Sequence, residues 1–380
     1  MLLSAVSIDY SYHYSHYPKV FVAPRAPVGF SVDSIDGNLD KPCWQNVSWS
    51  DPFDDIRGPD DAPSSANKDR PTTKTRVKMM WDDSYLYIGA LLEREPQMPT
   101  PATFTDRNSP IYQRDSDFEV FIDIPGSCHR YKEFEVNAIN TVWNLMLDKP
   151  YMDGGHEHSG RVAKEGEDDF YEVYQQTSST RVIQGKLNDP YEGATWSVEL
   201  AMAYTDLMND VHLLTTTTMN SNTQPLEMVI PPSKSHWRIN FSRVEKQGDI
   251  NWTWQPQIVW DAQLHRYRGM VNMHLPDAWG YVVFHDDDSS VSPIVKDTSW
   301  PLRMAGMSLY YAQHEYKSRY GVFAERIEQV IDLMDQSAVS PFHVEIMLKG
   351  SGFEIIVQEK SCGWEVSVTD DRLVSATLHG

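Results

Sequence analysis

The sequence predicts a mainly β protein, an antiparallel β-sandwich or barrel followed by a small C-terminal α+β unit. Three observations support this prediction. Short runs of alternating apolar and polar residues, separated by turn residues, fill residues 21–286. That region contains neither a long amphipathic helical pattern nor a repeat of fixed period. After residue 286 the spacing of apolar residues changes to that of a helix and then returns to alternation.

The clearest predicted hairpin is "TRVKMMWDDSYLYIGALLE", residues 75–93. Apolar residues occupy every second position on each side of a turn at residues 82–84. Further strands are expected in "GATWSVELAM", "HWRINFSRVE" and "WGYVVF". Four tryptophans in these strand patterns are expected in the core: Trp81, Trp196, Trp237 and Trp279.

A second hairpin, in residues 112–137, carries an unusual number of acids. "YQRDSDFEVFID" alternates so that Phe118, Val120 and Ile122 share one face and the acids share the other. "YKEFEVN" follows after a Pro-Gly turn and places Glu133 and Glu135 on one face. If the two strands pair, like charges oppose one another, which is unfavourable. Solvent or basic partners, a bound ligand or calcium, or a pair of catalytic carboxylates would each offset this repulsion.

The chain divides into four predicted segments. Residues 1–20 form a flexible arm, 21–286 the sandwich, 287–295 a polar linker, and 296–380 the α+β unit. In the last segment, apolar residues at spacings of three and four predict a helix over residues 312–335, weakened near its start by Gly321. An antiparallel meander follows.

The composition of the chain limits the classes of ligand and the cellular compartment that we expect. A net charge of −21 disfavours nucleic acid and anionic membranes, and it suits neutral or cationic ligands, bound calcium, or simple solubility. No apolar run is long enough to enter and span a bilayer. Three dispersed cysteines and a poor signal-peptide pattern favour a cytoplasmic protein, with secretion as the alternative.

Several phrases in order resemble carbohydrate-binding module family 9, over about residues 30–286. They are "SIDGNLDKPCW", "MMWDDSYLYIGA", "QRDSDFEVFID", "YKEFEVN", "GKLNDP", "WSVELAM", "WRINFSRVE" and "VNMHLPDAWGYVVF". The C-terminal unit resembles an extension found in longer, uncharacterised relatives. The resemblance implies a jelly-roll sandwich that clamps a sugar between aromatic rings and holds its hydroxyls with carboxylates and amides. It also implies structural calcium in some members.

Carried over residue by residue, the resemblance is partial. Tyr112 falls at the first aromatic clamp, Glu119 on a hydroxyl-binding carboxylate, and Asn137 keeps an amide. Glu135 stands where sugar binders have Arg, and Met273 replaces the second aromatic clamp.

Other residues complete the predicted site. Trp252, Trp254 or Trp260 is a candidate to supply the missing aromatic plane, with Trp254 preferred. His274 is a candidate hydrogen-bonding group, or a turn cap. The full predicted ligand-binding set is Tyr112, Glu119, Glu133, Glu135, Asn137, Trp254, Met273 and His274. The loop "MDGGHEHSG", with Asp153, His156 and His158, is a weaker metal candidate and more often a solvated loop.

We therefore predict a non-catalytic protein that holds a glycan end or short oligosaccharide. Two alternatives remain: glycoside hydrolase activity in carbohydrate catabolism, and a structural or protein-interaction sandwich that has lost sugar binding. The substitutions at Glu135 and Met273 favour the last of these.

Overall fold

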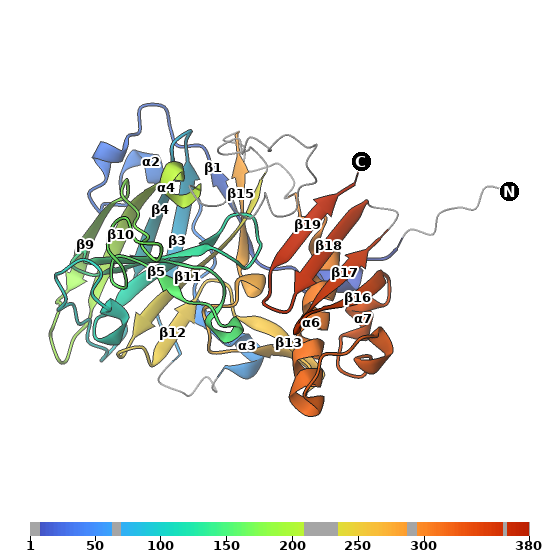
Figure 1. Cartoon of the computed structure of the whole chain (residues 1–380). Helices are drawn as coiled ribbons and strands as arrows, with labels where there is room; N and C mark the ends of the chain where they lie inside the picture. Colours follow the sequence, from blue (N-terminus) through green and yellow to red (C-terminus); the bar gives the residue numbers. More distant parts are fainter. Residues whose placement is uncertain (1–7, 63–69, 209–234, 287–294, 360–362, 380) are drawn as a thin grey trace.

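The computed structural model describes residues 8–62, 70–208, 235–286, 295–359 and 363–379. Figure 1 shows a β-sandwich, coloured blue to yellow, beside a smaller C-terminal unit coloured orange to red. The predicted fold class is confirmed, because antiparallel sheets build most of both parts.

The larger sheet of the sandwich has nine strands. Seven of them follow one another as neighbours: β1 (Val20–Pro24), β15 (Gly280–His285), β11 (His236–Glu245), β5 (Asp117–Asp123), β6 (Tyr131–Asn137), β7 (Val142–Leu147) and β8 (Glu157–His158). Two more, β12 (Ile250–Thr253) and β2 (Asp54–Asp55), extend from β11. β1 and β15 run parallel, and the other pairs are antiparallel.

The second sheet is smaller and covers one face of the first. Its order is β3 (Thr75–Trp81), β4 (Tyr85–Leu92), β10 (Ala194–Ala203) and β9 (Thr177–Gly185). The main core lies between the sheets and contains Phe118, Val120 and Ile122, as their alternation predicts. Trp81, Trp196, Trp237 and Trp279 are all buried, as predicted. Short helices α2 (Pro42–Gln45), α3 (Gly58–Asp61) and α4 (Tyr204–Met208) lie in the connections.

The C-terminal unit packs one long helix, α6 (Trp300–Tyr320), against a four-stranded meander. The strands are β16 (His343–Lys349), β17 (Gly352–Gln358), β18 (Trp364–Thr369) and β19 (Val374–Leu378), as the alternation predicts. A hairpin of β13 (Ile258–Asp261) and β14 (Arg266–Gly269) contributes Trp260 to the same core.

The predicted helix over residues 312–335 is wrong in both bounds. The helix begins at Trp300 and ends at Gly321, which adopts the left-handed conformation with φ +79° and accordingly terminates it. The residues beyond fold back through the 3-10 turn η5 (Ile327–Gln329) and the short helix α7 (Gln336–Val339). Val330 and Met334 are buried there, so their spacing reflects core packing rather than one continuous helix.

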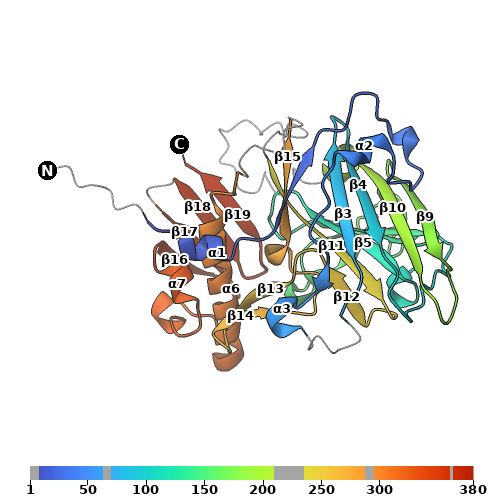
Figure 2. The same ribbon diagram turned by 180° about the vertical axis from the view of Figure 1, so that it is seen from behind.

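The described part of the predicted N-terminal arm is not loose. Residues 11–15 form the short helix α1 (Ser11–Ser15), which Figure 2 shows against the C-terminal unit. His13 is 1% exposed, and its Nε2 lies 2.9 Å from the Ala338 carbonyl oxygen. Tyr12 donates a hydrogen bond of 2.8 Å to Asp335. Aromatic side chains make this segment apolar enough to pack, although its serines and histidines suggested a solvated arm.

Three sequence-based expectations concern other parts of the chain. Residues 287–294 of the predicted linker lie outside the described residues, and the segment boundaries remain a prediction. Cys43 and Cys128 are free thiols. In the described part of the chain, no helix combines the length and apolar character needed to cross a bilayer.

Candidate functional site

A groove of about 530 Å³ lies on the face of the larger sheet that is turned away from the main core. Its size falls in the range of pockets that hold small ligands. Strands β5, β6 and β7 form most of its floor, β11 and β12 add Val244 and Asn251, and loops and short turns supply other lining residues. The lining includes acidic, aromatic and other polar or apolar side chains: Tyr112, Glu119, Glu133, Glu135, Trp143, Tyr151, Arg161, Met273 and His274.

Strand register brings the floor residues together. Glu119 on β5 pairs with Glu135 on β6, which pairs in turn with Trp143 on β7. In the neighbouring row, Phe121 pairs with Glu133. Because side chains of paired residues point to the same face, these carboxylates and aromatic rings lie side by side on the floor. The predicted pairing of the two acid-bearing strands is thereby confirmed.

Aromatic rings border these carboxylates. Tyr112, in the 3-10 turn η2 (Ile111–Gln113), stacks on Trp143 with ring centroids 5.6 Å apart and an interplanar angle of 21°. The Arg161 guanidinium lies 4.3 Å from the Trp143 ring centroid and also pairs with Glu157. Tyr112 is partly exposed, whereas Trp143 is buried, so Tyr112 presents the accessible ring.

A second group of lining side chains, Tyr151 and His274, comes from connecting segments outside the strands. Tyr151, in η3 (Tyr151–Asp153), packs edge-on against His274 with centroids 4.8 Å apart. The Tyr131 hydroxyl lies 3.1 Å from Nδ1 of His274. Burial lowers the pKa of His274 to about 4, so the imidazole is neutral near pH 7. A neutral imidazole both donates and accepts hydrogen bonds.

Four buried acids form what we call the acidic cluster: Asp117, Glu119, Glu133 and Glu135. Burial raises the pKa of Glu119 to about 8. Burial, and then the negative charge of neighbouring acids, raises the pKa of Asp117 well above its usual value. The same two causes raise the pKa of Glu133 and of Glu135. Each charged form is disfavoured because it is removed from water and faces like charges.

The acidic cluster is incompletely satisfied. Within the described residues, both carboxylate oxygens of Asp117 and one oxygen each of Glu119 and Glu135 are buried without a hydrogen-bond partner. Buried polar atoms nearly always have partners in folded proteins. Three carboxylate oxygens, one from each of these residues, lie within 4.8 Å of one another.

Six of the eight predicted ligand-binding residues line this single groove: Tyr112, Glu119, Glu133, Glu135, Met273 and His274. Their binding role itself remains a prediction. Asn137 does not line the groove, because its Nδ2 donates to Asp115 and to the Phe104 carbonyl in a buried turn. Trp254 does not either, since it is 1% exposed in the main core. Trp252 is equally buried, and Trp260 packs in the core of the C-terminal unit.

Trp143, Tyr151 and Arg161 are among the groove residues that the sequence prediction missed. Trp143 lies in "TVWNLML", directly after the second acidic strand, so a third paired strand would have placed it beside Glu135. Tyr151 and Arg161 lie in loops whose course no alternation pattern predicts. None of the three later tryptophans lines the groove, and the tryptophan beside the acids is Trp143 on the next strand.

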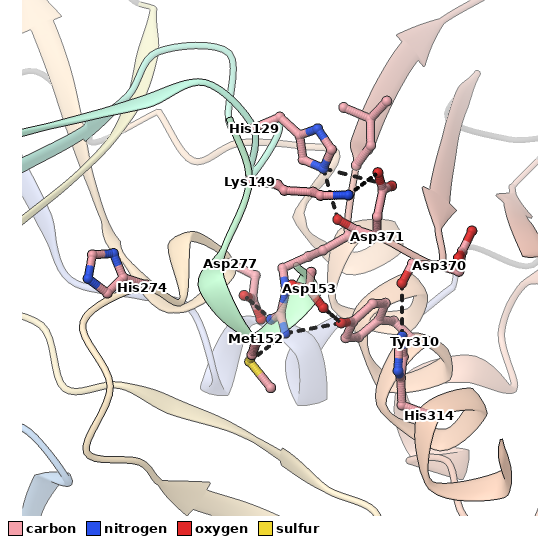
Figure 3. A network of polar contacts seen from close by, with 12 residues as sticks. His129, Lys149, Met152, Asp153, His274, Asp277, Tyr310, His314, Asp370 and Asp371 are labelled. Atoms are coloured by element: carbon pink, nitrogen blue, oxygen red, sulfur yellow. Dashed lines mark hydrogen bonds and ion pairs between the residues drawn. The ribbon is translucent and has the colours of Figure 1, made fainter. Parts of the chain in front are cut away.

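A second buried group of charges, which we call the Arg372 cluster, joins the C-terminal unit to the loops beside the groove. It consists of Arg372 and four residues whose oxygen atoms accept hydrogen bonds from its guanidinium: Asp153, Asp277, Tyr310 and Tyr311. Arg372 Nε lies 2.7 Å from Asp153, and its Nη1 lies 2.8 Å from Asp277. Figure 3 shows Asp153, Asp277 and Tyr310 gathered in this network, and His274 to one side of it.

The candidate metal ligands in the histidine loop differ from the predicted set in their acidic member. His156 and His158 group with Asp148 rather than with Asp153, which the Arg372 cluster holds. His156 is exposed, and both His156 and His158 lie within salt-bridge distance of Asp169. These contacts give both histidines an acidic partner within the loop.

No protein-family model matches the sequence, and no curated protein matches it. Solved structures do match. One is a carbohydrate-binding module of family 9 from Caldicellulosiruptor kristjanssonii, in complex with cellotriose. It is 17% identical in sequence, with a TM-score of 0.37, and the match covers 73% of this chain and 100% of that chain. The glucose complex from the same organism is 16% identical, with a TM-score of 0.37 and coverage of 72% and 100%. A provisionally named carbohydrate-binding protein from Bacteroides uniformis is 13% identical, with a TM-score of 0.43 and coverage of 70% and 100%.

Proposed function

We propose that this chain binds carbohydrate without altering it, holding a glycan end or a short oligosaccharide in the groove. The observation that carries the proposal is the composition of one recess. It places the accessible ring of Tyr112 beside the carboxylates of Glu119, Glu133 and Glu135. Sugars have apolar C–H faces that pack on aromatic rings, and dense hydroxyls that need fixed hydrogen-bonding groups.

The loop residues extend the same chemistry. His274 is a neutral donor and acceptor, and Tyr151, 47% exposed, offers a second aromatic surface. Met273 adds a thioether that packs on apolar ring faces. The acidic groove, in a chain of net charge −21, favours a neutral or cationic saccharide over an anionic one.

Binding is tested by calorimetry against glucose, cellotriose and a panel of neutral and amino sugars, using the full chain. We expect Tyr112→Ala to weaken binding about tenfold, which corresponds to about 1.4 kcal/mol of lost contact. Tyr191→Ala is the matched control, because Tyr191 is 85% exposed and does not line the groove. The control should bind as the unaltered chain does.

Two outcomes would overturn the proposal. If no saccharide binds, or if Tyr112→Ala and Tyr191→Ala bind equally well, the groove is not a sugar site. Reducing-sugar release from the same oligosaccharides, abolished by Glu119→Gln, would instead assign hydrolysis. Tyr191→Ala is again the control, and it should leave any release of reducing sugar unchanged.

A further inference from the structure

We propose that Asp117, Glu119 and Glu135 bind a hard divalent cation, Ca²⁺ by preference, in the floor of the groove. The proposal does not depend on saccharide binding, because the cation itself is the ligand that is measured. It rests on the spacing of the carboxylates, on their unpartnered oxygens, and on the chemistry of their surroundings.

The first observation is spacing. One oxygen from each of Asp117, Glu119 and Glu135 lies within 4.8 Å of the other two. Oxygens that bind one Ca²⁺ lie about 2.3–2.6 Å from the ion, so any two of them are at most about 5 Å apart. The three carboxylates therefore already stand at a separation that a single ion can bridge.

The second observation is the lack of hydrogen-bond partners. Asp117 is 0% exposed, and both of its carboxylate oxygens are without a partner among the described residues. One oxygen of Glu119 and one of Glu135 share this condition. An unpaired buried carboxylate is costly, whereas a coordinated cation removes that cost for all three at once.

Neighbouring cations are engaged elsewhere. Arg243 pairs with Glu245 at 2.7 Å and also donates to Thr75 and to the Glu93 carbonyl. Arg161 pairs with Glu157. Among the residues that the structure describes, neither guanidinium forms a salt bridge with Asp117, Glu119 or Glu135. The negative charge of these three carboxylates is therefore left for a bound cation to balance.

The donor set decides the class of ion. All three ligands are carboxylate oxygens, which suit Ca²⁺, Mg²⁺ or Mn²⁺ and not the thiolate- or imidazole-preferring metals. Glu119 and Glu135 line the groove, so its open volume leaves room for water or ligand oxygens in the remaining positions. Ca²⁺ takes six to eight oxygens in a flexible geometry, which fits an incomplete set on paired strands better than the strict octahedron of Mg²⁺.

The test uses the full chain, stripped of metal with a chelator and dialysed into mildly alkaline buffer. Ca²⁺ binding is followed by calorimetry, and Tb³⁺ binding by luminescence excited through tryptophan. Trp143 is the cross-strand neighbour of Glu135, so Tb³⁺ held there should emit strongly. We expect saturable binding of one ion at this site.

Variants locate the ion. Asp117→Asn and Glu135→Gln, both nearly isosteric, should each weaken Ca²⁺ binding at least about tenfold. His156→Ala is the control, because it removes a member of the other candidate group while leaving the acidic cluster intact. Circular dichroism of each variant verifies folding, and Glu135→Gln serves if Asp117→Asn does not fold.

The proposal is overturned if neither Ca²⁺ nor Tb³⁺ binds, or if binding survives both substitutions. Loss of binding in His156→Ala alone would move the site to the histidine loop and equally overturn it. Because saccharide is absent from these measurements, a negative result leaves the proposed carbohydrate binding to its own experiment.

Discussion

The two buried charged clusters of this molecule differ in how their charges are matched. In the Arg372 cluster, one guanidinium meets Asp153 and Asp277, and two tyrosine hydroxyls complete the set. In the acidic cluster, four carboxylates face one another, and several of their oxygens have no hydrogen-bond partner in the described part of the chain. Matched charges hold elements together, whereas unmatched charges indicate where a ligand completes the structure.

The largest expected effect is in the Arg372 cluster. Arg372→Met would leave Asp153 and Asp277 buried without their cation, and we expect a loss of about 3–5 kcal/mol in the free energy of unfolding. Urea denaturation measures it. Arg319→Ala is the control, because Arg319 is 43% exposed in an i,i+4 pair with Glu315 and should cost less than about 0.5 kcal/mol. Similar losses in both variants would contradict the contrast between the clusters.

Removal of one acid from the acidic cluster should raise the free energy of unfolding, whereas loss of Arg372 lowers it. In chelator and alkaline buffer, Asp117→Asn removes an unpartnered buried acid whose charged form is disfavoured, so we expect the free energy of unfolding to rise by about 1–3 kcal/mol. The same denaturation experiment measures it. With saturating Ca²⁺ the order should reverse, since the unaltered chain alone keeps all three proposed ligands. A destabilised variant in chelator would show that Asp117 has a partner inside the fold.

The smallest expected effect concerns pH and His274. Its folded pKa, about 4, lies below the ordinary value of 6.5, so the unfolded chain binds more protons between these values. Stability from this residue is therefore present above pH 6.5 and is lost as the pH falls towards 4. Between pH 7 and pH 5 we expect a loss of about 1–2 kcal/mol. The raised pKa values of the acidic cluster act oppositely in this range.

Substitution isolates the histidine contribution. His274→Gln keeps a polar side chain but does not titrate, so the difference in unfolding free energy between it and the unaltered chain should shrink as the pH falls. Denaturation at a series of pH values gives this difference directly. A constant difference would mean that His274 titrates alike in the folded and unfolded chain.

Alternation predicted much of the fold and part of the groove. A period of two places Glu119 on the opposite face from Phe118 and Val120 whatever the later folding, and the hairpin turn then sets Glu135 beside it. Tyr112, which the family resemblance put forward, lies in η2, five residues before that strand begins. These predictions succeeded because each depends on contacts that are local or nearly local in sequence.

The failures involve long-range packing. Trp254 lies in the main core directly after β12, which pairs with β11 in the larger sheet, and its polar neighbours did not reveal this burial. Asp153 pairs with Arg372, 219 residues later, so no local pattern indicates that contact. The helix bounds were missed because the apolar spacing continues past Gly321 into a segment that folds back onto the same core.

The N-terminal helix α1 has a practical consequence for anyone who expresses this chain. Trp300 of α6 donates to the His13 carbonyl at 3.0 Å, and Tyr17 stacks on Tyr281 with centroids 5.2 Å apart. Deleting the first twenty residues as an apparent tail would remove aromatic side chains that pack on both parts of the molecule. The apolar surface exposed by the deletion would favour aggregation. Purification tags are better attached at the opposite end.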